Sequence, residues 1–497
     1  MNISIYIEPI SAAKDLTCKL LEEEFDIQDT IAVLLYDKII APHFAQIKDG
    51  AFLLAETNYV DKVYRDSFYS YYSSKLPRYK RDCIRISIFD DEIKIDDFWN
   101  KDEHANLQGK YSGFLILRPT DPNLIGRSII SPKVLKINNF RSCISTFNTT
   151  ANGVKFTVKG FPHSSQDRET ISCAETSLWA IMEYFSTKYP EYQPTLPSKI
   201  IRTLNTVSSE RQIPSKGLNI AQMSYALKEF GFGTKIYSNH QYGTLFFNLL
   251  SCYIESGIPV IVAMENRPIG NIGHALLAIG HDKITDLKID SAAPIYKDTT
   301  KNITLYDFDS IEKDFIFIDD NHPAYQKASL TNPAVNYSAA EWNGCQVTYF
   351  IVPLYPKIYL EAYEVKNFLN NFLLQGPEPL NDNSEVLLRT YLVSSRSFKH
   401  EVSQNDTIQD ELKSILLETC MPKFVWVSEV TTKDLLKERK ANGIILIDAT
   451  EANIFFNKPL IIAAYQDKII MFDERAKSLE KNSITLHNYC MFEHNLY

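Results

Sequence analysis

Cys173 is the cysteine whose place in the sequence best suits nucleophilic chemistry. It stands at the expected start of a helix, within the segment QDRETISCAETSLW (166–179). Backbone N–H groups at a helix start are unpaired and lie at the positive end of the helix dipole, so they favour a thiolate and can hold an oxyanion. By contrast, Cys252 falls on an apolar helix face and Cys345 lies beside a strand, and both positions are typical of packing.

A cysteine nucleophile also needs a histidine that accepts and returns a proton, and a third group that orients this histidine. Of ten histidines, His274 opens a buried strand in GHALLAIG (273–280), so its side chain can project toward a neighbouring helix start. Strand alternation places His281 on the opposite face. The orienting group should end or follow an adjacent strand, and the apolar strand 315–318 is followed by three candidates: Asp319, Asp320 and Asn321.

The elements that must position these residues follow an α+β order. Apolar residues recur at helical spacing after Ser172 until Pro190 stops the pattern. Further helices are expected over 219–230 and 245–255, and strands over 259–263, 274–279, 315–318 and 347–352. Helices followed by a run of strands indicate helices packed on an antiparallel sheet, because a doubly wound sheet would alternate strand and helix.

Three domains are expected in the 497 residues. The pattern over residues 1–140 predicts a mixed α/β domain with a helix over 16–25 and strands over 30–35, 84–89 and 114–117. The tyrosine-rich run 59–79 in this domain fits either a helix that packs its tyrosines against neighbouring elements or a recognition surface. Residues 141–356 form the central domain, introduced by a hairpin at Asn152-Gly153. Residues 357–497 form a β-rich domain with a helix over 365–374, strands over 424–427, 443–447, 460–464 and 468–472, and a turn at Gln466-Asp467.

Composition excludes several classes of function. The chain has 52 basic and 61 acidic residues, a net charge of −9, which argues against a dedicated binder of nucleic acid or of an anionic membrane. It contains no run of 18 apolar residues and its first residues do not read as a secretory signal, so the cytoplasm is the expected compartment. The eight cysteines lie far apart without zinc-type spacing, and phosphate-loop, GxGxxG, HExxH, EF-hand and GxSxG motifs are missing.

The three candidate segments, taken together, resemble the papain-like cysteine peptidases, most closely the branch that includes bacteriocin leader peptidases. In that branch a glutamine precedes a helix-capping cysteine, a Gly-His opens a strand, and an Asp followed by a turn closes the next one. The resemblance covers about 160–355. It implies that Cys173 is the nucleophile, His274 the general base and then acid, and Asp319 the orienting carboxylate, with Asp320 or Asn321 as alternatives. Gln166 would donate to the oxyanion beside the Cys173 backbone N–H, although it lies seven residues before Cys173 where the family usually has six.

The leading hypothesis is therefore a cysteine hydrolase that cleaves a peptide or isopeptide bond through an acyl-enzyme, with neither a metal nor an organic cofactor. Two alternatives remain open at this stage: transfer of the acyl group to an amine, as in transglutaminase-like enzymes, and a non-catalytic peptide-binding module of the same fold. The expected partner is a protein or peptide substrate, and the flanking domains are candidates for binding a partner protein. Processing of leader peptides is not expected, since those enzymes usually begin the chain of a membrane transporter.

Overall fold

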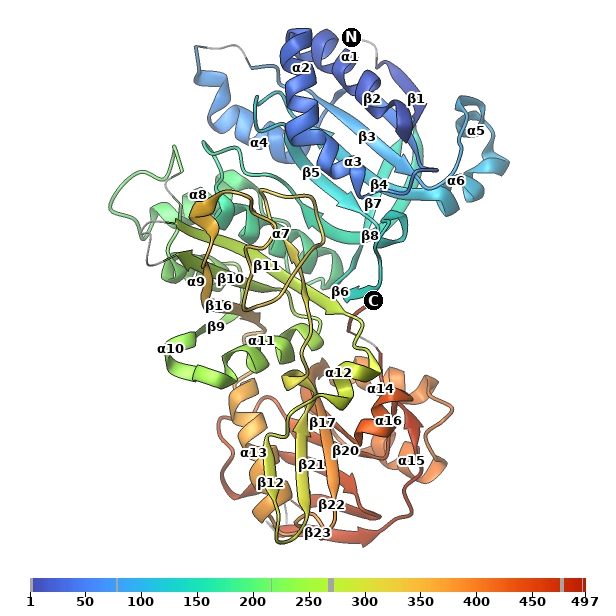
Figure 1. The fold of residues 1–497 in the computed structure, drawn as a ribbon, viewed down its shortest axis with the longest axis vertical. Helices are drawn as coiled ribbons and strands as arrows, with labels where there is room; N and C mark the ends of the chain where they lie inside the picture. The colour runs from blue at the N-terminus through green and yellow to red at the C-terminus, as the bar shows by residue number, and fades with distance from the viewer. Residues whose placement is uncertain (1–2, 77–78, 216, 267–271, 474–477, 494) are drawn as a thin grey trace.

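The described residues form three large β-sheets that follow one another along the length of the molecule, each packed with helices (Figure 1). The computed structural model describes residues 3–76, 79–215, 217–266, 272–473, 478–493 and 495–497. Most neighbouring strands pair antiparallel, and β13 (Ile303–Asp307) pairs with β17 (Glu385–Ser394) in parallel. The protein is thus mixed α+β and multidomain. Within the described ranges, no helix has the length and apolar character needed to cross a bilayer.

The first sheet has the strand order β1-β2-β3-β4-β5-β8-β7, and its central strands β3 and β4 are buried on both faces. Ile84, Ile86 and Ile88 join the core beneath the N-terminal helices, whereas Phe89 and Phe114 join an aromatic core on the other face. The strands are β1 (Ile5–Pro9), β2 (Phe52–Tyr59), β3 (Cys83–Phe89), β4 (Tyr111–Leu117), β5 (Ile125–Ile130), β7 (Ser145–Ala151) and β8 (Val154–His163). The helices are α1 (Ala13–Phe25), α2 (Asp29–Leu35), α3 (Ala41–Ala45), α4 (Lys62–Ser70), α5 (Ile95–Trp99) and α6 (His104–Lys110).

The strand expected over 30–35 is wrong, because this segment is helix α2. A short apolar run has no period that separates a strand from a buried helix. In the structure, Ala32 and Leu35, three residues apart, are buried against α1, while Ile31 and Leu34 are exposed. That spacing of buried residues belongs to a helix.

The tyrosine-rich run contains helix α4, as expected. Asp61 caps it by accepting hydrogen bonds from the backbone N–H groups of Val63 and Tyr64. Tyr64 and Tyr72 are buried in the aromatic core, whereas Tyr69 is exposed. The buried tyrosines therefore serve packing.

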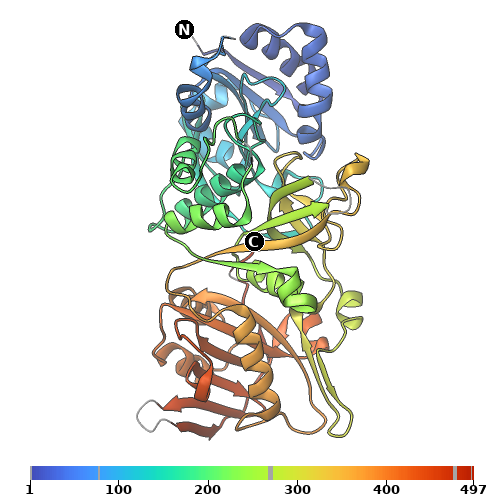
Figure 2. The ribbon, with the colours of Figure 1, turned by 90° about the vertical axis from the view of Figure 1, so that its left-hand side faces the viewer.

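Two segments that lie inside the expected central range 141–356 are hydrogen-bonded into the flanking sheets. The β7–β8 hairpin turns at Asn152-Gly153, where both residues have positive φ (44° and 80°), and β8 pairs with β5 of the first sheet. The hairpin of β12 (Tyr296–Asp298) and β13 joins the third sheet, and Figure 2 shows it in yellow-green reaching down beside that sheet. Long-range strand pairing of this kind has no local sequence signal.

The central sheet has the order β15-β14-β11-β10-β16-β9, with β6 also paired to β11. Helix α7 contacts β7 and β8, whereas α11 contacts β17, so they cover opposite sides of the sheet (Figure 1). The strands are β6 (Phe140–Ser142), β9 (Gly233–Ser238), β10 (Val260–Asn266), β11 (Ile272–Asp282), β14 (Phe315–Ile318), β15 (Gln326–Ala328) and β16 (Gln346–Leu354). The helices are α7 (Cys173–Lys188), α8 (Pro197–Asn205), α9 (Ile220–Glu229), α10 (Asn239–Tyr242) and α11 (Phe246–Glu255).

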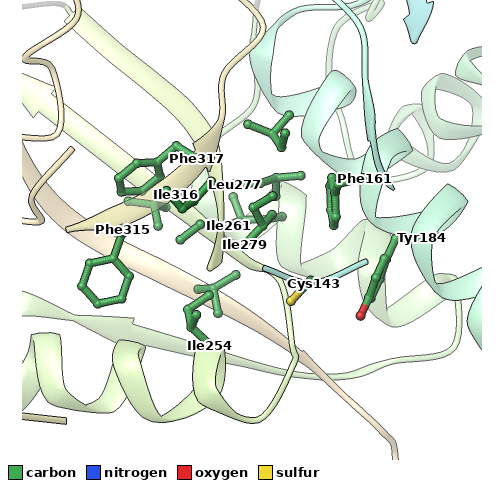
Figure 3. Packing of buried hydrophobic residues seen from close by; sticks show 14 of the residues in the cluster. Cys143, Phe161, Tyr184, Ile254, Ile261, Leu277, Ile279, Phe315, Ile316 and Phe317 are labelled. Carbon is green, nitrogen blue, oxygen red and sulfur yellow. The ribbon is translucent and has the colours of Figure 1, made fainter. Parts of the chain in front are cut away.

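The core of this sheet is continuous with that of the first sheet. Figure 3 shows Leu277 and Ile279 of β11 beside Phe317, with Phe161 of β8 and Tyr184 of α7 close by. The Phe161 and Tyr184 rings stack with their centroids 5.2 Å apart. The strand that carries His274 is therefore held in a core built from both sheets.

The third sheet has the order β12-β13-β17-β18-β20-β21-β22-β23 and includes the strands expected in the C-terminal domain. Gln466 and Asp467 both have positive φ and form the expected turn between β21 and β22. The remaining strands are β18 (Phe424–Thr431), β20 (Gly443–Asp448), β21 (Leu460–Tyr465), β22 (Lys468–Asp473) and β23 (Ser478–Ser483), and β19 (Lys440–Ala441) pairs separately with β24 (Tyr489–Cys490). The helices are α12 (Asp286–Asp290), α13 (Ala362–Gln375), α14 (Ser395–Gln404), α15 (Asp410–Glu418) and α16 (Lys433–Lys437).

Buried side chains join the first sheet to the loop that follows β14. The Tyr325 hydroxyl donates to the carbonyl of Ile130 at 2.8 Å and accepts from the N–H of Phe161 at 2.9 Å. The His163 ring lies against the same loop. The His43 ring packs on the His163 ring, and the two ring centroids are 5.5 Å apart. Burial lowers the pKa of both histidines, that of His43 furthest, so both imidazoles are neutral in the folded protein.

This buried pair predicts acid sensitivity. The pKa of each ring is lower in the folded chain than its unfolded value of 6.5, so the unfolded state binds more protons below that pH. The contribution of these two neutral rings to the free energy of unfolding is fully present above about pH 6.5. Below that pH the free energy of unfolding falls by at most about 1.4 kcal/mol per pH unit for each proton that the unfolded chain binds in excess. We expect urea titrations between about pH 5 and 7.5 to show this slope, and the variant His43→Phe to flatten it.

The matched control is His400→Phe, which changes an exposed histidine on α14. It should keep the slope of the natural chain. An unaltered slope in His43→Phe would show that the acid sensitivity does not arise at this junction.

Candidate active site

Cys173 is the first residue of helix α7, as the sequence predicts. The backbone N–H of Ser172 donates to the side chain of Glu175 at 3.1 Å, and the first helical hydrogen bond runs from the Thr176 N–H to the Ser172 carbonyl. The same glutamate is buried and accepts from the hydroxyl of Ser215 at 2.8 Å, which holds the helix start in place. The Cys173 thiol is half-buried, and the backbone N–H of Ala275 points at its sulfur from 3.5 Å.

His274 lies near the start of β11 and is buried between Cys173 and Asp319. Its Nε2 donates to Asp319 Oδ1 at 2.9 Å, and the Cys173 thiol is a second hydrogen-bond partner of the ring. Burial by itself would lower the pKa of His274, but the negative charge and hydrogen bond of Asp319, together with Cys173, raise it well above the usual value. The ring is therefore a stable imidazolium beside the thiol.

The three candidates for the orienting group occupy different positions. Asp319 contacts the His274 ring directly, and its Oδ1 also accepts from the Asn321 N–H at 3.0 Å. Burial would raise the pKa of Asp319, yet the charge and hydrogen bond of His274 lower it to about 2. Asp320 Oδ1 lies 3.6 Å from His274 Nε2, too far for a hydrogen bond. Burial, reinforced by the charge of Asp319, raises the pKa of Asp320 to about 7.

Two aromatic side chains that the sequence analysis did not single out complete the surroundings of the imidazole. The Tyr337 hydroxyl donates to Asp319 Oδ2 at 2.7 Å and lies 3.1 Å from His274 Nε2. Trp342 stacks on Tyr337 with ring centroids 3.8 Å apart. The rings of Trp342 and His274 are arranged edge to face, with their centroids 5.6 Å apart. Both lie in the long connection between β15 and β16, where no periodic pattern marks them, so composition and spacing carried no signal.

Gln166 lies on the Asp319 side of the site. Its side-chain N–H donates to Asn321 Oδ1 at 2.8 Å, and Gln166 does not line the cavity next to Cys173. The chain between Gln166 and Cys173 turns around Asp167, whose Oδ1 accepts from three successive backbone N–H groups, while Arg168 adopts a positive φ of 60°. The structure thus brings Cys173, His274 and Asp319 together and pairs Gln166 with the turn that follows Asp319.

A cavity of about 550 Å³ opens beside the sulfur and the imidazole. Its wall is more apolar than polar and comes mainly from the start of α9, the end of β10 and the start of β11, with Tyr349 of β16. The apolar lining side chains include Leu218, Ile220, Met223, Ala263 and Met264. A molecule that reaches Cys173 through this cavity would lie against this wall.

Neither a protein-family model nor any curated protein sequence matches this chain. The case for chemistry at Cys173 therefore comes from the sequence pattern and from the geometry of the site.

The first sheet contributes to this geometry through His163. Its Nε2 lies 3.2 Å from the Asp319 carbonyl and 2.9 Å from the His322 carbonyl, so it holds both ends of the turn that carries Asp319. We expect His163→Phe, which keeps a ring but removes the donor, to slow alkylation of Cys173 by iodoacetamide about 10- to 100-fold, because a shift of about 1 Å in a reacting group has effects of this size.

The matched control is His43→Phe, whose ring packs on His163 rather than on the turn. Mass spectrometry of the Cys173 peptide at neutral pH measures both rates. Equal rates in the two variants would show that His163 only fills space.

Proposed function

We propose that the protein is a cysteine hydrolase that cleaves a peptide or isopeptide bond. The observation that carries the proposal is the buried imidazole of His274, which has the Cys173 thiol on one side and the Asp319 carboxylate on the other. Structural cysteines do not need a charged, oriented histidine, whereas a nucleophilic one does. The other cysteines in the described residues are buried in apolar cores or lie at exposed positions (Cys18, Cys83, Cys143, Cys252, Cys345, Cys420 and Cys490).

The arrangement of elements supports a papain-like central domain. The cysteine begins a helix that packs on β11, the histidine lies on β11 itself, and the carboxylate follows the neighbouring strand β14. This order of helix, strand and strand agrees with the resemblance found in the sequence. The β-sheets that flank it are additions to that core.

The chemistry follows from the charges in the site. The Cys173 thiolate attacks a carbonyl carbon at the edge of the cavity, and the free N–H groups of the first turn of α7 stabilise the oxyanion. His274 then donates its proton to the leaving amine as the C–N bond breaks, which leaves a thioester on Cys173. Water gives up a proton to His274 and attacks the thioester, and this releases the acid and regenerates the thiolate–imidazolium pair.

Asp319 holds His274 correctly turned throughout this cycle and stabilises its charge whenever the ring is protonated. The oxyanion donor that the geometry favours is the Cys173 backbone N–H, because it lies at the helix start next to the sulfur. Gln166 would have to exchange its hydrogen bond to Asn321 before it could donate to the oxyanion.

Selective alkylation tests the proposed nucleophile. We expect iodoacetamide to label Cys173 faster than the exposed Cys420 and Cys490, because the imidazolium stabilises its thiolate. His274→Ala should slow this labelling, and should slow hydrolysis of a library of fluorogenic peptide amides by about 10²- to 10⁴-fold, the usual contribution of an acid–base group. Cys173→Ala should abolish hydrolysis.

Comparison of Asp319→Asn with Asp320→Asn separates the two acids. The first removes the negative charge bound to Nε2 and should slow Cys173 labelling strongly, and the second should slow it much less. Labelling of Cys173 no faster than that of Cys420 in the presence of a metal chelator would contradict the proposed function. If the product formed in the presence of an added amine is an amide rather than an acid, the proposed function becomes acyl transfer in place of hydrolysis.

A further inference from the structure

Asp320 is a buried acid for which the proposed chemistry has no use. Its side chain is 2% exposed, and in the described structure neither of its carboxyl oxygens has a hydrogen-bond partner. A carboxyl group buried without partners is costly, and native proteins keep such groups where an ion or a reaction needs them. The Asp320 carboxyl lies 3.6 Å from His274 Nε2, on the side of the ring that Asp319 already occupies.

The three side chains together have the geometry of a ligand set for a metal ion. His274 Nε2 and one carboxylate oxygen each from Asp319 and Asp320 lie within 4.8 Å of one another, and all three residues are buried. Two of the separations are 2.9 and 3.6 Å, on either side of the roughly 3.3 Å expected between ligands in a tetrahedron with bonds of about 2.0–2.1 Å. A neutral imidazole and two carboxylates carry a charge of −2, which balances a divalent cation.

We propose that His274, Asp319 and Asp320 form a binding site for a divalent transition-metal ion of the zinc type. An imidazole nitrogen with carboxylate oxygens in a dry, compact site suits Zn²⁺, whereas Mg²⁺ prefers six oxygen ligands and keeps several waters. The ion takes the place of the proton that His274 Nε2 shares with Asp319 and of any proton on Asp320, so these protons leave as the ion binds and the ring keeps its other proton at Nδ1.

The neighbouring groups already support the ligands. The Tyr337 hydroxyl donates to Asp319 Oδ2, and the Asn321 N–H donates to Asp319 Oδ1. Hydrogen bonds of this kind orient ligating carboxylates in metal sites and contribute about 10- to 100-fold to affinity. The Tyr337 oxygen, 3.1 Å from Nε2, lies where a fourth ligand or a bound water would complete the coordination.

Occupation of this site would silence Cys173, a consequence that rests on the proposed function. With a metal ion on Nε2, the ring keeps only the Nδ1 proton that faces Cys173, and loss of that proton would give an imidazolate, so the ring is a weaker acid toward a leaving amine than the imidazolium is. The cation thus displaces the Nε2 proton that makes the ring an imidazolium, and the thiol regains its full reactivity when the cation leaves. The inference is therefore a reversible block of the nucleophile by a metal ion.

Binding of Zn²⁺ to the Cys173→Ala chain tests the site without the thiol as a ligand. Equilibrium dialysis with metal analysis should find one Zn²⁺ per chain. Asp320→Asn in the same background should weaken binding about tenfold or more, because a neutral amide is a poor zinc ligand. The matched control is Asp314→Asn, which changes a half-buried acid at the other end of β14 and should leave the affinity unchanged.

Co²⁺ titration of the natural chain gives a readout that does not depend on any variant. We expect the absorption of tetrahedral Co²⁺ without a thiolate charge-transfer band, and slower alkylation of Cys173 in the presence of Zn²⁺ that a chelator restores. A thiolate band would assign the ion to the thiol and overturn the proposed site. Zn²⁺ binding that is lost in Cys173→Ala but kept in Asp320→Asn would do the same. Absence of any Zn²⁺ binding would also overturn the site.

These outcomes separate the two proposals. If Cys173 is labelled fast and selectively in the presence of a chelator, and dialysis finds no bound Zn²⁺, the metal site is overturned and the proposed function is supported. One Zn²⁺ bound to Cys173→Ala, with Cys173 of the natural chain unreactive in chelator, would support the metal site and overturn the proposed function.

Discussion

The hydrogen bond from His274 Nε2 to Asp319 is the interaction on which the site depends. Both groups are almost fully buried, and in that environment neither charge would persist without the other. The bond exists because β11 and β14 pair antiparallel, which brings the end of β14 beside the start of β11. The register pairs Leu277 with Ile318, so the residue after Ile318 emerges next to the histidine. Strand pairing thus sets the distance that the charge pair requires.

The same strand is anchored at its other end by a second buried charge cluster. His281 Nε2 contacts Glu255 of α11 at 2.9 Å, and Arg389 of β17 binds Glu255 and Glu429. His274 contacts Cys173 at the start of α7, whereas His281 contacts α11 on the other side of the sheet, and the register of β11 with β14 shifts between the two histidines, after Ala278. One histidine faces the candidate site and the other faces the third sheet. Between them Gly280 allows β6 to pass closely, since a Cβ there would lie 2.0 Å from the Arg141 carbonyl oxygen. The third sheet therefore helps to fix β11, and the first sheet fixes the Asp319 turn through His163.

Local signals in the sequence predicted the elements that carry the site. The capped helix at Cys173, the apolar strands around His274 and before Asp319, and the turn at Asn152-Gly153 all depend on neighbours in the chain. The position of Tyr337 could not be predicted, because a loop without periodicity carries it to the imidazole. The pairing of Gln166 with Asn321, and of the β7–β8 hairpin with the first sheet, depend on contacts between distant segments. Helix α2 was misjudged because its burial pattern is imposed by α1.

Asp319 and Asp320 show how two identical neighbours take different states from their surroundings. Asp319 receives donors from His274, Asn321 and Tyr337; against the effect of burial, the charge and hydrogen bond of His274, with help from His322 and the Asn321 N–H, lower its pKa to about 2. Asp320 receives none within the described structure, and its pKa is raised to about 7 by burial and by the charge next to it. Two adjacent carboxylates in a dry site cannot both ionise cheaply unless a cation lies between them. Asp319 already orients His274, so Asp320 is not needed for that role. The burial of Asp320 is explained if its negative charge balances a cation other than the His274 imidazolium.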